Sequence, residues 1–98
     1  MTDDDEPWDP DAVVELPITD ELDLHTFAPR DVKDLVGEYL EAALAKGFVE
    51  VRIVHGKGVG VLREIVHGVL RTHAAVEHFA LAEERRGGWG ATIVKLRR

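Results

Sequence analysis

The feature that most constrains the fold is a change in the spacing of apolar residues along the chain. They recur with helical spacing over residues 29–46, whereas in the segments before and after this range they alternate with polar residues. The helical stripe contains Val32, Leu35, Val36, Tyr39, Leu40, Ala43 and Leu44. Residues 21–25 before it, and residues 48–54 after it, have the period of two expected of a strand with one buried face. We therefore predict a strand-helix-strand unit. Its strands should be parallel, because such crossovers are right-handed and return in the same direction.

A second set of periodic segments follows a glycine-containing loop at residues 55–60. Apolar residues then recur at helical spacing, which predicts a helix that ends at about residue 73 or 74. Residues 76–83 and 91–96 have the pattern of two strands, and the glycine-rich segment between them is typical of a hairpin turn. The predicted order of elements is β-α-β-α-β-β.

One face of the sheet is expected to meet water, because Glu50 and Arg52 alternate with the apolar residues of the second strand. Helices on both faces would require a continuously apolar strand. We therefore predict an α/β two-layer sandwich, with a mixed four-stranded sheet and two helices on one face. Tyr39 and Phe79 belong to apolar stripes and are expected in the core.

Charge is distributed unevenly along the chain, whose formal net charge is -7. Residues 1–24 contain ten carboxylates and no Lys or Arg, whereas the rest has twelve bases against nine acids, a net +3. We predict an acidic disordered tail over residues 1–12 and one folded domain over residues 13–98. The mildly basic body permits a nucleic-acid partner, although the overall charge alone argues against one.

The chain contains no cysteine, which excludes disulfides and thiolate metal sites and fits a reducing compartment. No apolar run reaches the roughly 18 residues of a membrane-spanning helix, and the acidic start is unlike a signal peptide. We expect a cytoplasmic protein without a membrane partner, and a monomer is favoured.

Two histidines follow the strands that are predicted to be parallel. His25 and His55 are therefore expected at the edge of the sheet where open α/β sheets bind ligands. They could be a general acid and base for phosphoryl transfer, two metal ligands, or polar residues at strand ends. Asp23 shares a strand face with His25 and could orient it. Because no metal-ligand spacing is recognisable, no metal site is predicted, and a divalent metal such as magnesium stays an open possibility.

Gly56, Gly58 and Gly60 lie between a predicted strand and a predicted helix. Such a loop can turn backbone N–H groups toward an anion at the helix N-terminus, and Lys57 adds a positive charge. The alternative is a tight turn that needs left-handed backbone angles. The spacing matches neither standard nucleotide-binding loop.

Several motifs along the chain together resemble the Smr (small MutS-related) domain family. They are Leu22-Asp23-Leu24-His25, Ile53-Val54-His55-Gly56-Lys57-Gly58, Leu62-Arg63 and Gly90-Ala91-Thr92-Ile93-Val94-Lys95-Leu96. The resemblance covers about residues 20–98 and implies a two-layer α/β sandwich. It also implies DNA nicking, RNA cleavage or RNA binding. In this family a glycine usually follows the first histidine, whereas this chain has Thr26, so the turn there is expected to differ.

The resemblance and the residues together predict a nucleic-acid-binding domain, with DNA or RNA as partner and an endonuclease activity. Asp23, His25 and His55 are the predicted catalytic residues. The predicted nucleic-acid contacts are Arg52, Gly56, Lys57, Gly58, Gly60, Arg63 and Trp89. Trp89 could stack on an unpaired base or pack over the sheet edge. The alternatives are a binding adaptor that does not cleave, and a protein-interaction module whose contacts come from the acidic tail.

Overall fold

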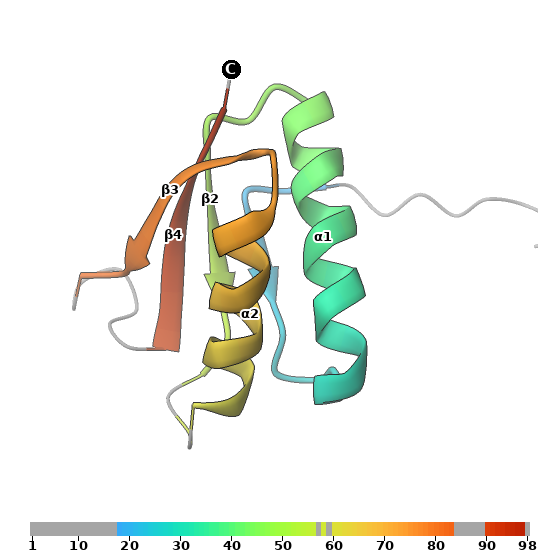
Figure 1. The fold of residues 1–98 in the computed structure, drawn as a ribbon, viewed down its shortest axis with the longest axis vertical. Helices are drawn as coiled ribbons and strands as arrows, with labels where there is room; N and C mark the ends of the chain where they lie inside the picture. The colour runs from blue at the N-terminus through green and yellow to red at the C-terminus, as the bar shows by residue number, and fades with distance from the viewer. Residues whose placement is uncertain (1–17, 57, 59, 84–89, 98) are drawn as a thin grey trace, which may run out of the picture.

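The computed structural model describes residues 18–56, 58, 60–83 and 90–97. Their helices and strands are β1 (Glu21–Asp23), α1 (Pro29–Ala45), β2 (Glu50–Val54), α2 (Val61–Thr72), β3 (Val76–Leu81) and β4 (Ala91–Leu96) (Figure 1). This is the predicted order of elements.

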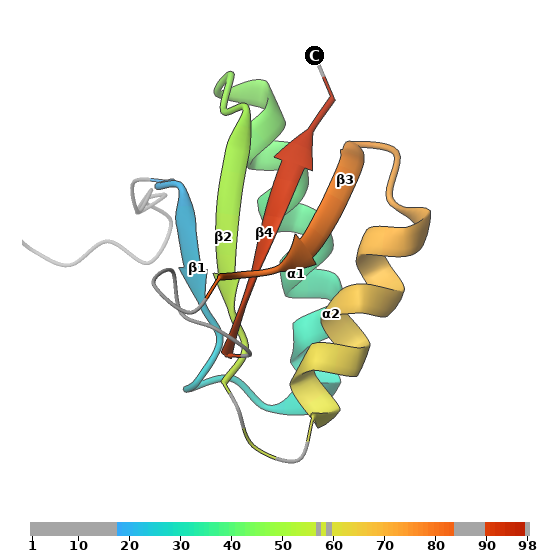
Figure 2. The same cartoon turned by 90° about the vertical axis from the view of Figure 1, so that its left-hand side faces the viewer.

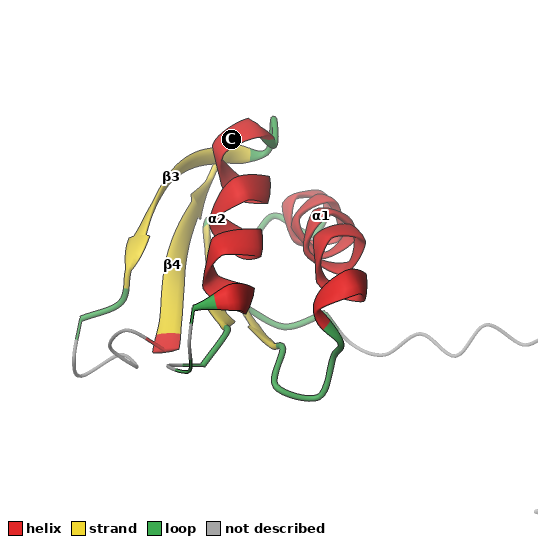
Figure 3. Cartoon of the chain, turned by 60° about the horizontal axis from the view of Figure 1, so that its bottom comes forward, coloured by secondary structure: helices red, strands yellow, loops and turns green. Residues whose placement is uncertain are grey.

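The strands form one mixed sheet in the spatial order β1-β2-β4-β3. β1 and β2 are parallel, as predicted, and Asp23 is paired with Val54 at the end of β2. β4 runs antiparallel to both of its neighbours, β2 and β3. Figures 1 and 3 show both helices on one face of the sheet, and Figure 2 looks onto the face that neither helix covers. The predicted two-layer α/β sandwich is confirmed.

The core lies between the sheet and the helices, and strand alternation decides which side chains enter it. Val51 and Ile53 of β2 are buried there, whereas Glu50 is exposed on the open face. Tyr39 is buried as predicted, but Phe79 is only half-buried and packs against the margin of the core. One face of the sheet is therefore in contact with water, as the sequence pattern indicated.

The first strand ends at Asp23, two residues earlier than the predicted end at His25. The N–H of Phe27 donates a hydrogen bond of 3.0 Å to the carbonyl of Leu24, which closes a turn immediately after the strand. Local turn formation therefore outweighs the continued alternation of the sequence.

The second strand begins at Glu50, whereas the sequence pattern predicted Phe48. The N–H of Phe48 instead donates to the carbonyl of Ala43 at 3.1 Å and so satisfies a free carbonyl at the end of α1. The third strand ends at Leu81 instead of Glu83.

The predicted acidic tail at residues 1–12 lies outside the described residues, and so do residues 84–89 of the predicted turn. The antiparallel pairing of β3 with β4 agrees with the predicted hairpin. In the described part of the chain, neither helix has the length and apolar character that crossing a membrane requires.

Candidate functional site

The carboxyl ends of β1 and β2 lie together at one edge of the sheet, at the bottom of Figure 2. Beyond the last paired residues, the N–H of Leu24 still donates to the carbonyl of Val54 at 2.9 Å. His25 and His55 are the next residues along the two chains, so the structure places both at this edge. Ligand crevices of open α/β sheets lie at this position.

Asp23 holds His25 through two contacts. Its Oδ1 accepts the backbone N–H of His25 at 3.0 Å and lies 2.7 Å from Nδ1 of the ring. The backbone N–H of His25, followed by its ring, lowers the pKa of the Asp23 carboxyl. Because a carboxylate only accepts, Nδ1 carries the hydrogen and Nε2 is left for other partners. The imidazole is 72% exposed, so this oriented ring faces solvent.

Thr26 occupies the turn after His25, at the position for which the resemblance predicted a different turn. No residue other than glycine has a positive φ among those described, so Thr26 adopts an ordinary backbone conformation. The turn presents His25 next to Asp23, and its difference from the turn of the family stays a prediction.

His55 has a different environment from His25. It continues the alternation of Val51 and Ile53, and its side chain enters the helix-covered face with only 5% of the residue exposed. Nε2 lies 2.8 Å from Oγ1 of Thr92, and Nδ1 lies 3.1 Å from the carbonyl oxygen of Gly56. Burial lowers the pKa of His55, against the effect of the Gly56 hydrogen bond. Both ring nitrogens are therefore engaged by protein atoms.

The two histidines share an edge of the sheet but do not form a joint acid-base pair in this structure. Among the described residues, no hydrogen bond, ion pair or ring contact joins His25 to His55. For His55 the sequence contained this information, because His55 is in phase with the buried Ile53 and alternate residues of a strand point to the same face. His25 lies in the turn after β1, where its exposure follows from the turn.

Thr92 and His67 belong to this site, although the sequence reasoning gave His67 no role. Nε2 of His67 lies 2.8 Å from Oγ1 of Thr92, the same hydroxyl that contacts His55. The rings of His55 and His67 meet edge to face with centroids 6.0 Å apart, and Phe79 lies beyond His67 at 5.0 Å. Alternation in β4 places Thr92 in phase with buried Val94, which was the available signal for a buried hydroxyl.

A hollow of about 160 Å³ lies in front of the glycine loop and the first turn of α2. Its lining consists of His55, Gly56, Gly58, Gly60, Val61, Leu62 and Arg63. The N-cap Gly60 has a φ of 89° and offers no side chain to cap the helix, whose first N–H groups have no partner within the helix. Nη2 of Arg63 lies 2.7 Å from the point that a Cβ on Gly60 would occupy. The hollow thus combines the positive end of a helix dipole with a guanidinium group.

One predicted anion contact is used within the protein. The N–H of Gly56 donates to the carbonyl of Gly90 at 2.9 Å, as does the N–H of His55. The N–H of Gly56 is therefore engaged by Gly90, just before β4, and in this conformation it does not face the hollow as a free donor. Among the described residues, the donors near the hollow include the N–H groups at the start of α2.

The other residues that were predicted to contact nucleic acid do not all lie near the hollow. Arg52 lies on the open face of the sheet, where its Nη2 is 3.0 Å from Oε1 of Glu21. Lys57 and Trp89 lie outside the described residues. Within the described ranges, no three His, Asp or Glu side chains form a group that could hold a metal ion.

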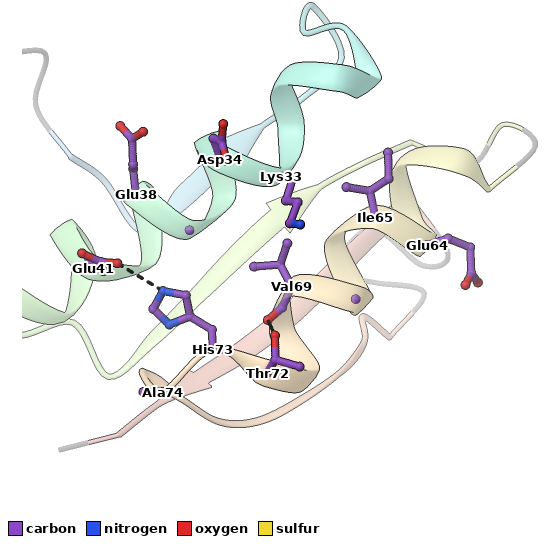
Figure 4. Close-up of a pocket in the computed structure, with 12 residues that line it drawn as sticks. Lys33, Asp34, Glu38, Glu41, Glu64, Ile65, Val69, Thr72, His73 and Ala74 are labelled. Carbon is purple, nitrogen blue, oxygen red and sulfur yellow. Dashed lines mark hydrogen bonds and ion pairs between the residues drawn. The ribbon is translucent and has the colours of Figure 1, made fainter.

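A larger hollow, of about 900 Å³, lies between α1 and α2 (Figure 4). Glu41 of α1 approaches His73 across it, with 3.6 Å between Oε2 and Nε2. Of the predicted site residues that the structure describes, none lines this hollow. The motif residues at the sheet edge and this interhelical hollow are therefore separate features.

Comparison with known proteins agrees with the motifs. The sequence profile of the Smr domain matches residues 22–97. Endonuclease MutS2 of Thermomicrobium roseum is 38% identical over 88 residues, covering 89% of this chain and 11% of that protein. Endonuclease MutS2 of Geobacillus kaustophilus is 42% identical over 77 residues, covering 79% of this chain and 10% of that protein. The chain thus spans about a tenth of the length of these relatives.

Solved structures show the same relationship. The Smr domain of Thermus thermophilus MutS2 superposes with a TM-score of 0.77 at 39% identity, covering 82% of this chain and all of that one. YdaL, a stand-alone small MutS-related protein from Escherichia coli, has a TM-score of 0.77 at 30% identity, with 84% and 67% of the two chains covered. The profile match and these identities establish that the chain belongs to the Smr domain family.

Proposed function

We propose that this Smr domain binds DNA or RNA at the edge of its sheet and cleaves a phosphodiester bond there. The observation that carries the proposal is the exposed His25 ring, oriented by Asp23 at the end of β1, beside the glycine loop that follows β2. The relatives named endonuclease MutS2 support this assignment of the reaction class.

In this proposal, the hollow at the start of α2 binds the phosphate backbone of the nucleic acid. A phosphate group suits it, because the free N–H groups and the dipole of a helix N-terminus favour an anion. Arg63 adds a charge that pairs well with phosphate oxygens. Lys57 belongs to the same loop in sequence and would strengthen this attraction.

In this proposal, His25 carries out the proton transfer. Its Nε2 removes a proton from the attacking oxygen or returns one to the leaving oxygen, while Asp23 fixes the tautomer and stabilises the protonated ring. Proton transfer by His55 would first need one of its two hydrogen bonds to open. In the proposed mechanism His55 therefore shapes the loop, and His25 moves the proton.

The test measures cleavage and binding separately on the full chain. Supercoiled plasmid and a structured RNA are incubated with magnesium or with chelator, and binding is measured over a range of salt concentrations. We expect His25→Ala and Asp23→Asn to lose about tenfold or more of the cleavage rate while they still bind. Arg63→Ala should weaken binding and flatten its salt dependence. His78→Ala, on the exposed side of β3, is the matched histidine control and should change neither.

Cleavage that persists in His25→Ala would overturn the catalytic assignment. Salt-sensitive binding without any cleavage by the unmodified chain would establish the binding adaptor instead. Loss of activity in chelator would assign a role to a divalent metal, such as magnesium.

A further inference from the structure

A chain of hydrogen bonds, centred on the buried hydroxyl of Thr92, connects α2 to the glycine loop. It runs from Nε2 of His67 through the hydroxyl of Thr92 to Nε2 of His55, and from Nδ1 of His55 to the carbonyl of Gly56. Thr92 is 0% exposed, so water does not compete for its hydroxyl. The chain joins residues from three elements behind the hollow in which we place the phosphate.

The direction of every hydrogen bond in this network can be deduced from the carbonyl at one end. A carbonyl only accepts, so Nδ1 of His55 carries a hydrogen. In the neutral ring Nε2 of His55 is then an acceptor, and the Thr92 hydroxyl donates to it. That hydroxyl has a single hydrogen, so its contact with His67 requires Nε2 of His67 to donate. Burial lowers the pKa of both His55 and His67, which favours the neutral rings that this pattern uses.

The residue immediately before β4 also holds the backbone at the start of the loop. The carbonyl of Gly90 accepts the N–H groups of His55 and Gly56, two residues before Thr92 binds the His55 ring. The carbonyl of Gly56 is the negative end of a peptide dipole, and Gly56 lines the hollow in which we place the phosphate. The hydrogen bond from the His55 ring offsets the partial negative charge of the Gly56 carbonyl and fixes the direction in which this carbonyl points. The orientation of His55 therefore affects what the loop can bind.

We propose that His67, acting through the Thr92 hydroxyl, is a positioning residue that holds His55 in its Nδ1–H form and thereby holds the Gly56 carbonyl in its orientation beside the hollow. This inference rests on the proposed function for its consequence in binding. Its structural part, the tautomer of His55, is independent of that function.

Two pairs of variants test this network of hydrogen bonds. Thr92→Val removes the hydroxyl at nearly constant shape, whereas Thr92→Ser keeps it. His67→Leu removes the donor, whereas His67→Gln keeps an N–H donor that does not titrate. The readouts are the imidazole nitrogen chemical shifts of His55 by NMR and the affinity for a fluorescent single-stranded RNA.

We expect the Nδ1–H form of His55 in the unmodified chain and in the two conservative variants, and a mixture of tautomers in Thr92→Val and His67→Leu. The affinity for the RNA should fall about tenfold in the latter two and less than about threefold in the conservative pair. If Thr92→Val fails to fold, the half-exposed position of His67 leaves the second pair to decide.

An Nε2–H form of His55 in the unmodified chain would overturn the direction of the bonds. An unchanged tautomer in His67→Leu would overturn the role of His67. If the unmodified chain binds no RNA and no DNA, the proposed function fails, whereas the tautomer measurement still decides the inference about His67.

Discussion

Replacing Gly60 with alanine should affect both stability and binding, for two separate physical reasons. Gly60 has a φ of 89°, in the left-handed region, where a residue with a Cβ loses about 1–2 kcal/mol. The new Cβ would also lie 2.7 Å from Nη2 of Arg63. Because the guanidinium ends a flexible side chain, it will move at little cost to folding, but it will leave the hollow. We expect a lower melting temperature, by roughly 4–16 °C for a domain of this size, and weaker binding of nucleic acid.

Two neighbouring glycines provide matched controls. Gly56 has a φ of 84°, and a Cβ added there would meet no atom within 4 Å, so Gly56→Ala should show the backbone strain without displacing Arg63. Gly58 has no left-handed backbone and also has open space around it, so Gly58→Ala should be neutral or stabilising by about 0.4–1 kcal/mol. Thermal unfolding measures the first effect, and fluorescence anisotropy with a labelled oligonucleotide measures the second.

The three variants can refute the reasoning in different ways. Equal loss of stability in Gly58→Ala and Gly60→Ala would show that the left-handed backbone is not the cause. Binding by Gly60→Ala as tight as that of Gly58→Ala would show that the approach of Arg63 to Gly60 does not position the guanidinium for binding.

Two further predictions concern stability. Burial lowers the pKa of His55 and of His67 below the ordinary value of 6.5, so the folded state takes up these protons less readily than the unfolded state. Their contribution to stability is full above about pH 6.5 and is lost as the pH falls through the pKa values of the folded state. The free energy of unfolding in urea should therefore be lower at about pH 5.5 than at about pH 7.5. A higher free energy of unfolding at the lower pH would contradict this prediction. Val66→Ala, at a fully buried position of α2, should cost about 2 kcal/mol, whereas Val61→Ala, at a half-exposed position of the same helix, should stay within about 0.5 kcal/mol. Similar costs for the two variants in urea unfolding would show that α2 does not pack as described.

The predicted endonuclease and its alternatives differ in what they require of the site. Binding requires only the hollow and its positive groups, whereas cleavage also requires a group that moves a proton. The exposed dyad of Asp23 and His25 is the described feature that fits the second requirement. Substitutions at the hollow and at the dyad therefore separate the two functions.

Much of the architecture could be predicted because it follows from local periodicity. The stripe from Val32 to Leu44 specifies one amphipathic helix, and alternation specifies the strands and the buried face of each. The chirality of the crossover then makes β1 and β2 parallel and brings His25 and His55 to one edge. The predicted positions of the strand ends were less accurate, because single hydrogen bonds, such as that from Phe27 to Leu24, decide where a strand ends.

The partners within the site were decided only by the tertiary structure. Thr92 lies 37 residues from His55 and 25 residues from His67, and no short-range pattern links positions so far apart. Their contact depends on the packing of α2 against the sheet and on the register between β2 and β4. The sequence by itself therefore determined which residue types reach the edge of the sheet. The contact of Asp23 with His25 is local and could be predicted from the sequence. Only the packing of the two layers decided that Thr92 contacts both His55 and His67, because hydrogen bonds form between neighbours in space.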